Sequence, residues 1–189
     1  MSDHDDIQQL TDSVLTMNIT SNAEVRRSSR TNAHLVAFFA QFEGFEYDPA
    51  KSVASEFKRL KRTPRWKKGI DRPQSLKNYK LALVLQFNDT YGTDQNDLGS
   101  WQNLCRAVGI ENAPDTLSAC KKAVTKTNVN LVDLVDMPNT QKPVTRFETV
   151  KQLSKYTKKH DKIFPRDEAK AGGILKYLLR QLFGPARYQ

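Results

Sequence analysis

Apolar residues recur along most of this chain at the three- and four-residue spacing of amphipathic helices. Successive stripes are separated by residues that end or begin helices, such as Gly44, Asp48-Pro49 and Pro64. The expected inward positions are Leu35, Phe38, Phe39 and Phe42; Val53, Phe57 and Leu60; Leu98, Trp101, Leu104, Cys105 and Val108; Leu117, Cys120 and Val124; Phe147, Val150 and Leu153; and Ala171, Leu175, Leu178 and Leu182.

The segment 75–90 is apolar on nearly all sides, which is typical of a helix at the centre of a bundle. Residues 129–136 fit either a helix with Leu131 and Leu134 inside or a short buried strand. No alternating strand pattern occurs elsewhere. The chain is therefore predicted to be all-α, as one compact bundle of seven or eight helices.

Two local features refine this prediction. Thr145-Arg-Phe-Glu148 has the form of a capping box and is expected to begin a helix. Gly172-Gly173 lies inside a helical pattern that begins at Pro165, although each glycine costs a helix about 1 kcal/mol relative to alanine. We expect a close approach of another segment at these glycines; a phosphate-cradling loop is the rarer alternative.

The expected domain limits follow from composition. Residues 1–32 are rich in Ser, Thr, Asn and Asp and are expected to be a disordered tail, with a short amphipathic turn from Ile7 to Leu15. Residues 33–184 form the predicted helical domain, and residues 185–189 form a C-terminal tail.

Charge is distributed unevenly along the chain, whose net charge is +9. The first 25 residues contain five acidic residues and no Lys or Arg, so the remainder holds 30 basic and 16 acidic residues. A body with this excess of cations attracts polyanions, because phosphate binding releases condensed counterions. The alternative is a basic surface that serves solubility only.

Several classes of protein are disfavoured. Two cysteines and three histidines are too few and too scattered for a structural zinc site, and no nucleotide-binding glycine motif occurs. We therefore expect no metal, no cofactor and two buried free thiols. No apolar run approaches the roughly 18 residues of a membrane span, and the start lacks a secretory signal. The expected location is the cytoplasm or nucleus.

The densest basic segment runs from Lys51 to Lys80, with eleven basic and two acidic residues. Trp66 lies within it, and cations around an aromatic ring suit phosphate contact with base stacking. The alternative is a solvated loop with Trp66 folded onto the core. The segment 142–180 is also basic, with eleven Lys or Arg against four acidic residues.

The stretch Trp101-x-x-Leu104-Cys105-x-x-Val108-Gly109 resembles the helix and turn of AT-rich-interaction (ARID-like) and other helix-turn-helix domains. That resemblance implies DNA contacts from the following helix. The turn from Gly109 to Pro114 is longer than the usual three or four residues, and two amphipathic helices in a bundle explain the same pattern. Together, the predicted nucleic-acid-binding residues are Lys58, Arg59, Lys61, Arg62, Arg65, Trp66, Lys67, Lys68, Arg72, Lys121, Lys122, Lys158, Lys159, Arg166 and Lys170.

No catalytic residue is predicted. Asp133 and Asp136 would share a helix face, and paired carboxylates can bind metal or exchange protons. No histidine is near them in the sequence, so we interpret them as polar positions of an amphipathic segment. Cys105 lies on an apolar stripe, where an inert thiol is expected rather than a nucleophile.

Three stretches resemble an uncharacterised family of small proteins from filamentous fungi: Trp101-Gln-Asn-Leu-Cys105, Val129-Asn-Leu-Val-Asp-Leu-Val-Asp136, and Ile163-Phe-Pro-Arg-Asp-Glu-Ala-Lys-Ala171. The resemblance extends over roughly residues 35–183. It implies a single intracellular domain and brings no known activity.

The sequence thus predicts a non-enzymatic binding module for an anionic partner, most simply nucleic acid. The alternative is a protein–protein interaction module that uses residues 7–15 with Phe45 and Tyr47.

Overall fold

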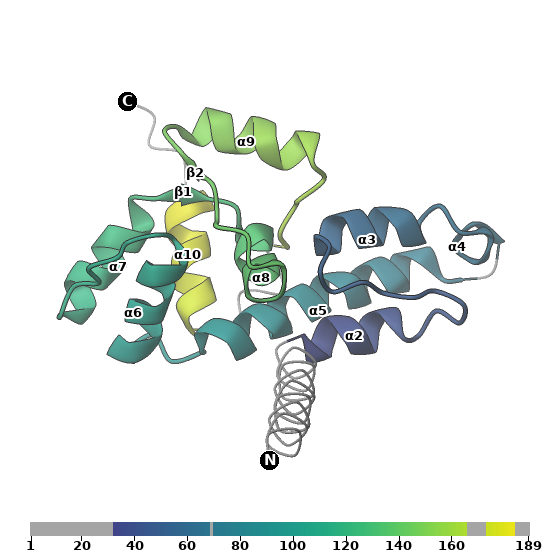
Figure 1. The fold of residues 1–189 in the computed structure, drawn as a ribbon, viewed down its shortest axis with the longest axis horizontal. Helices are drawn as coiled ribbons and strands as arrows, with labels where there is room; N and C mark the ends of the chain where they lie inside the picture. The colour runs from purple at the N-terminus through teal and green to yellow at the C-terminus, as the bar shows by residue number, and fades with distance from the viewer. Residues whose placement is uncertain (1–31, 69, 166–172, 184–189) are drawn as a thin grey trace, which may run out of the picture.

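The longest helix, α5 (Arg72–Tyr91), runs through the middle of the fold and contacts α2, α6, α8 and α10 (Figure 1). It begins where the Asp71 carboxylate accepts a hydrogen bond from the Gln74 N–H at 3.0 Å. It ends at Gly92, whose φ of +84° suits glycine. The predicted central helix is confirmed.

The computed structural model describes residues 32–68, 70–165 and 173–183, and elements are labelled as in Figure 1. The elements are α2 (Ala33–Phe39), α3 (Val53–Leu60), α4 (Pro64–Lys68), α5 (Arg72–Tyr91), α6 (Leu98–Ala107), α7 (Leu117–Thr125), β1 (Asn128–Val129), α8 (Leu131–Thr140), β2 (Arg146–Phe147), α9 (Val150–Lys159) and α10 (Gly173–Phe183). Within the described ranges these are nine helices and one two-stranded sheet, so the all-α prediction is confirmed.

The helices gather around the two ends of α5. Helices α2, α3 and α4 pack around its N-terminal half, α6, α7 and α10 lie at its C-terminal end, and α8 crosses between them (Figure 1). Every helix in the described part of the chain is too short or too polar to span a lipid bilayer.

An aromatic cluster holds the N-terminal half together. The rings of Phe57 and Tyr79 stack at 3.8 Å with an angle of 2° between their planes. Trp66 packs edge-on against Phe57 at 5.4 Å and also contacts Phe42. Burial of such rings contributes strongly to the core, because each removes a large apolar area from water.

The structure departs from the predicted pattern on α5 itself. Leu81 and Leu85 are 45% and 37% exposed, although the segment was expected to be covered on all sides. They lie one turn apart, on a side of α5 that faces away from the buried Leu83 and Phe87. The neighbouring helices therefore cover most of α5 but leave one apolar strip open.

Two boundaries also differ. Residues 64–68, expected in a loop, form the short helix α4, which turns Trp66 inward. The helix expected at Thr145 begins at Val150, because Arg146 and Phe147 pair with residues 128–129 as an antiparallel sheet. The capping box is instead formed by Thr149 and Gln152.

Residues 129–136 were expected to form either a helix or a short strand, and the structure has the end of a strand followed by a helix. Val129 ends strand β1, and α8 begins at Leu131. The Asn130 side chain caps α8 by accepting a hydrogen bond from the Val132 N–H at 2.9 Å.

The close approach expected at the paired glycines occurs at Gly173. A Cβ atom there would lie 1.7 Å from the carbonyl oxygen of Thr93 and 3.0 Å from the amide nitrogen of Gln95. Only glycine fits this position. Gly172, the predicted tails at residues 1–32 and 185–189, and the expected helix start at Pro165 to Ala171 fall wholly or partly outside the described residues. Of the N-terminal tail only Asn32 is described, and it is buried.

Candidate functional site

Helix α9 presents a row of lysines to solvent. Lys151, Lys155 and Lys158 are spaced four and three residues apart, so they fall on one side of the helix, and Lys159 lies beside them. All four are exposed, and none forms an ion pair with any described acidic residue. No residue of α9 is buried, so this helix lies at the margin of the fold.

The opposite side of α9 is attached by polar contacts. The Asn130 amide donates hydrogen bonds to the Thr157 hydroxyl at 2.8 Å and to the Lys162 carbonyl at 3.0 Å. The Lys162 ammonium donates to the Asp133 carboxylate and to the Tyr156 hydroxyl. These contacts connect α9 to α8 and fix which side of α9 faces outward.

Lys162 is part of this attachment rather than part of the surface row. Burial acts to lower the pKa of Lys162, but its hydrogen bonds to Asp133 and Tyr156 more than offset that effect, so its pKa is raised. Burial also raises the pKa of the Tyr156 hydroxyl. The ammonium therefore stays charged and paired at neutral pH.

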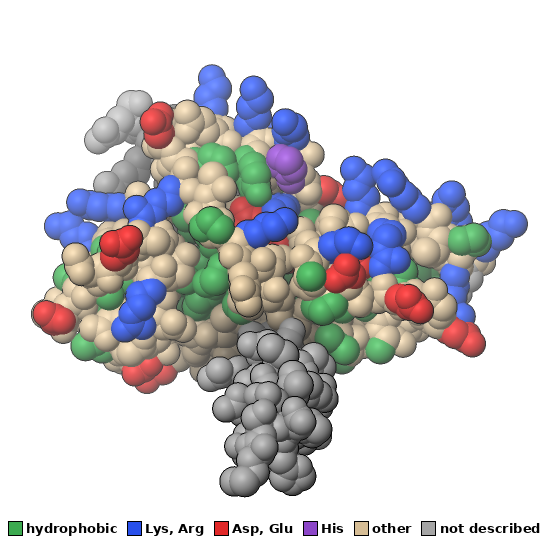
Figure 2. All heavy atoms as spheres, in the orientation of Figure 1, with side chains coloured by type: hydrophobic (Ala, Val, Ile, Leu, Met, Phe, Trp, Pro, Cys, Tyr) green, Lys and Arg blue, Asp and Glu red, His purple; other side chains and the backbone are tan. Residues whose placement is uncertain are grey.

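Helix α3 supplies the second part of the surface. The Lys61 ammonium lies 3.0 Å from a carboxylate oxygen of Asp161, just beyond the C-terminal end of α9. Lys58 on α3 and Arg62 just after it lie near Lys61 in the sequence, are exposed, and form no ion pair with a described acidic residue. Figure 2 shows basic side chains projecting along the edge formed by α9 and α3.

We call this surface the basic edge. Its members are exposed cations that have no acidic partner among the described residues: Lys58, Arg62, Lys151, Lys155, Lys158 and Lys159. Four of the six were predicted as phosphate contacts. Lys151 and Lys155 were not, although their four-residue spacing from each other and from Lys159 was available in the sequence.

Three further predicted cations are neutralised by neighbours. Arg59 pairs with Glu56 at 2.6 Å and its guanidinium lies 4.1 Å from the centre of the Phe45 ring. Arg65 pairs with Glu43 at 2.7 Å and lowers the pKa of that carboxyl. Lys61 is held by Asp161, as described above.

The other predicted residues near α4 are Arg72, Lys67, Lys68 and Trp66. Arg72 donates to the carbonyls of Trp66 and Lys67, which ties the loop after α4 to α5. Lys67 and Lys68 are exposed at the end of the fold. Trp66 is only 8% exposed, so the expectation that its ring stacks on bases is not met: the ring is used in the aromatic cluster.

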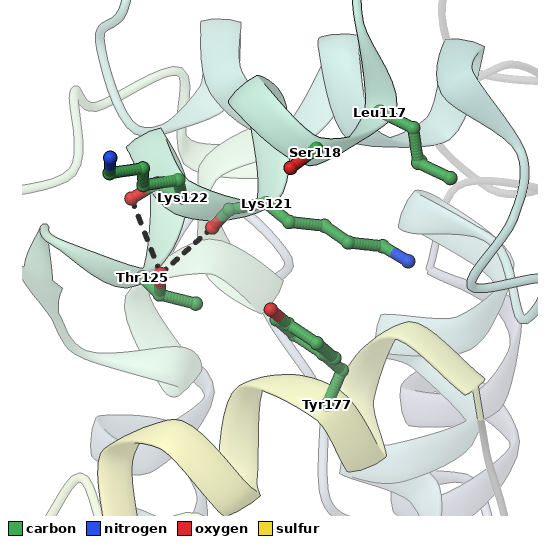
Figure 3. Close-up of a pocket in the computed structure, with 6 residues that line it drawn as sticks. All are labelled: Leu117, Ser118, Lys121, Lys122, Thr125 and Tyr177. Carbon is green, nitrogen blue, oxygen red and sulfur yellow. Dashed lines mark hydrogen bonds between the residues drawn. The ribbon is translucent and has the colours of Figure 1, made fainter.

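Lys121 and Lys122 lie on α7, on the opposite side of the fold from α3 and α4 (Figure 1). They line a pocket of about 430 Å³ between α7 and α10, with Tyr177 across from them (Figure 3). The Lys121 ammonium lies 5.6 Å from the Trp101 ring centre and 5.3 Å from that of Tyr177. Lys121 is therefore engaged with α6 and α10, and the predicted Arg166 and Lys170 fall outside the described residues.

The carboxylates of Asp133 and Asp136 do not form a joint site. Asp133 is paired with Lys162, whereas Asp136 accepts a hydrogen bond from the Val53 N–H at 2.8 Å, at the start of α3. Burial raises the pKa of Asp136 to about 6. Among the described residues, no three His, Cys, Asp or Glu side chains gather as metal ligands.

The two cysteines are buried free thiols, as predicted. Cys105 and Cys120 connect α6 to α7, with the Cys120 thiol donating to the Pro114 carbonyl at 3.0 Å. Burial, together with the nearby Cys120, raises the pKa of the Cys105 thiol to about 11. A thiol with so little thiolate at neutral pH is a poor nucleophile.

Comparisons of the chain with known protein families, with curated proteins and with solved structures find no match. The resemblances to a fungal family and to helix-turn-helix domains therefore stay predictions.

Proposed function

We propose that this protein binds nucleic acid through the phosphates, without catalysing a reaction. The observation that carries the proposal is the basic edge, where six exposed cations on α9, on α3 and just after α3 have no acidic partner among the described residues. Unpaired lysines held in a row are what a phosphate backbone requires, because each contact releases a condensed counterion.

The proposal is strengthened by how the other cations are used. Arg59 and Arg65 are tied to acidic residues, so they add little to the field outside the protein. Exposed cations without a described acidic partner also lie off the basic edge, as at Lys67, Lys68 and Lys126. What distinguishes the basic edge is the regular spacing of its lysines on one side of α9. A regular row of cations both attracts a polyanion and orients it.

The test is binding of a fluorescent nucleic acid measured across a salt series. We expect affinity to fall steeply with salt, with a slope of about −0.9 for each phosphate contacted. Replacing Lys151, Lys155 and Lys158 with Gln should lower the magnitude of the slope by up to about three and weaken binding by at least roughly tenfold at low salt.

A matched control variant distinguishes the effect of where the lysines lie from the effect of net charge alone. Lys77, Arg106 and Lys142 are exposed and lie off the basic edge, so their triple replacement with Gln removes the same net charge. That variant should keep most of the affinity and of the salt slope. Equal losses in the two variants, or no binding by the intact protein at low salt, would overturn the proposal.

Protein binding is the second candidate, favoured by one observation. Leu81 and Leu85 form an exposed apolar strip on α5. The aromatics first considered for this role are engaged elsewhere: Tyr47 stacks on Phe39 at 4.3 Å and Phe45 lies under Arg59. Binding to a protein through the strip would be weakly salt-dependent and would be lost in Leu81→Ser.

A further inference from the structure

We infer that the nucleic acid bound at the basic edge is double-stranded rather than single-stranded. The inference rests on the proposed function and specifies its substrate class. It follows from three properties of the surface: its rigidity, its lack of a stacking ring and its outward shape.

Helix α9 is capped at its N-terminal end and attached to α8 towards its C-terminal end. At the N-terminal end, the Thr149 hydroxyl accepts from the Gln152 N–H at 3.2 Å, and the Gln152 side chain accepts from the Glu148 N–H at 3.0 Å. At the C-terminal end, the Asn130 amide and the Asp133–Lys162 pair fix the helix to α8. A duplex presents phosphates in a regular array, so lysines on a fixed helix can meet it without reordering of the backbone, and only their side chains lose freedom.

The basic edge offers no aromatic surface for unpaired bases. Proteins that bind single strands stack bases on exposed aromatic rings. Within the described residues, the large apolar side chains that are exposed are all aliphatic: Val36, Leu76, Leu81, Leu85, Val150 and Ile163. Rings beside the edge are engaged by their neighbours: Tyr156 bonds to Asp133 and Lys162, Phe147 packs on Tyr156, and Phe57 stacks on Tyr79.

The shape of the edge also favours a duplex. Figure 2 shows the lysines of α9 projecting outward rather than lining a channel for a flexible strand. The pocket between α7 and α10 is lined by other residues. An α-helix is about 10–12 Å across with its side chains, which is close to the roughly 12 Å width of the DNA major groove.

The test compares ligands of equal length on the full chain. Fluorescence anisotropy is measured with a duplex of about 24 base pairs, in DNA and in RNA, and with each component strand of unstructured sequence, at about 50 mM salt. We expect at least one duplex to bind tenfold or more tightly than its own strands. Heparin serves as a polyanion without paired strands and should compete more weakly than the duplex per unit charge.

The controls separate the two proposals. Replacing Lys151, Lys155 and Lys158 with Gln should reduce the duplex-to-strand ratio to below threefold, whereas the Lys77, Arg106 and Lys142 variant should keep it. Circular dichroism checks that both variants fold. Strands that bind as tightly as the duplexes, or heparin that competes equally per charge, would overturn the inference and leave phosphate binding standing. No binding to any nucleic acid would overturn the proposed function itself.

Discussion

Lys61 and Asp161 lie 100 positions apart in the chain, yet the lysine Nζ and a carboxylate oxygen of the aspartate are 3.0 Å apart. This pair connects the residue after α3 to the turn after α9. Asp161 has a φ of +55°, in the left-handed region where Asp and Asn are tolerated better than most residues.

The Lys61–Asp161 pair should contribute little to stability, because both side chains are substantially exposed. In a double-mutant cycle with Lys61→Gln and Asp161→Asn, we expect a coupling free energy of about 0.2–1 kcal/mol that shrinks with added salt. Asn keeps the left-handed conformation, so the backbone is unchanged. Denaturant unfolding measures the cycle, and a coupling well above this range would show that the pair is a structural lock.

Asp136 should make stability depend on pH. Its pKa is raised by burial to about 6 from the ordinary 3.8. The folded protein therefore binds a proton that the unfolded chain has released, and this group's contribution falls as pH rises from about 3.8 to about 6. At neutral pH the buried charge costs on the order of 3 kcal/mol.

Asp136→Asn should therefore raise the free energy of unfolding at neutral pH, by about 1–3 kcal/mol, and flatten its decline between pH 4 and 6. The amide oxygen still accepts from the Val53 N–H at the start of α3. Asp136→Ala serves as the contrast, because it leaves that N–H without an acceptor and should destabilise the protein. Urea unfolding at several pH values checks both, and an Asn variant less stable than wild type at pH 7 would contradict the assignment.

Gly173→Ala should destabilise the protein severely, by at least about 3 kcal/mol, because the new Cβ would lie 1.7 Å from the Thr93 carbonyl oxygen. Gly99→Ala on α6 is the matched control. Its Cβ would meet nothing closer than 3.7 Å, so we expect a gain of up to about 1 kcal/mol from helix propensity. Thermal unfolding of the two variants gives the comparison, and equal melting temperatures would show that α10 does not pack against residues 93–95 as described.

Trp66→Phe should weaken the fold without weakening nucleic-acid binding. The indole is 8% exposed and packs against Phe42 and Phe57. The smaller Phe ring leaves a cavity, which should lower the free energy of unfolding by about 1–3 kcal/mol. The affinity for a duplex should change less than twofold in conditions where the variant is folded. Anisotropy titration measures this, and a tenfold loss of affinity would restore the stacking role that the burial of Trp66 argues against.

The α4 region shows why the sequence misplaced part of the site. Basic residues on both sides of Trp66 fit a solvated binding loop, and one short helix reverses that interpretation by directing the ring toward Phe57. The exposed strip of Leu81 and Leu85 is a similar case, since hydrophobicity predicts burial but not which neighbours are long enough to provide it. The lysine row on α9 had a local signal, the spacing from Lys151 to Lys159, and was within reach of sequence reasoning.

Most of the helices and their inward faces were determined by the sequence itself. The exceptions are α4, the start of α9, and Val150, which was expected to face inward and is 62% exposed. Periodicity and capping depend on residues within a turn or two of one another, as at Asp71, Asp97 and Thr116. Only the tertiary structure decided which cations remain unpaired. Lys61 is neutralised by Asp161, Arg65 by Glu43 and Lys162 by Asp133. Partners so far apart in the chain meet only when packing brings their helices together, because an ion pair depends on distance in space and not on position in the sequence.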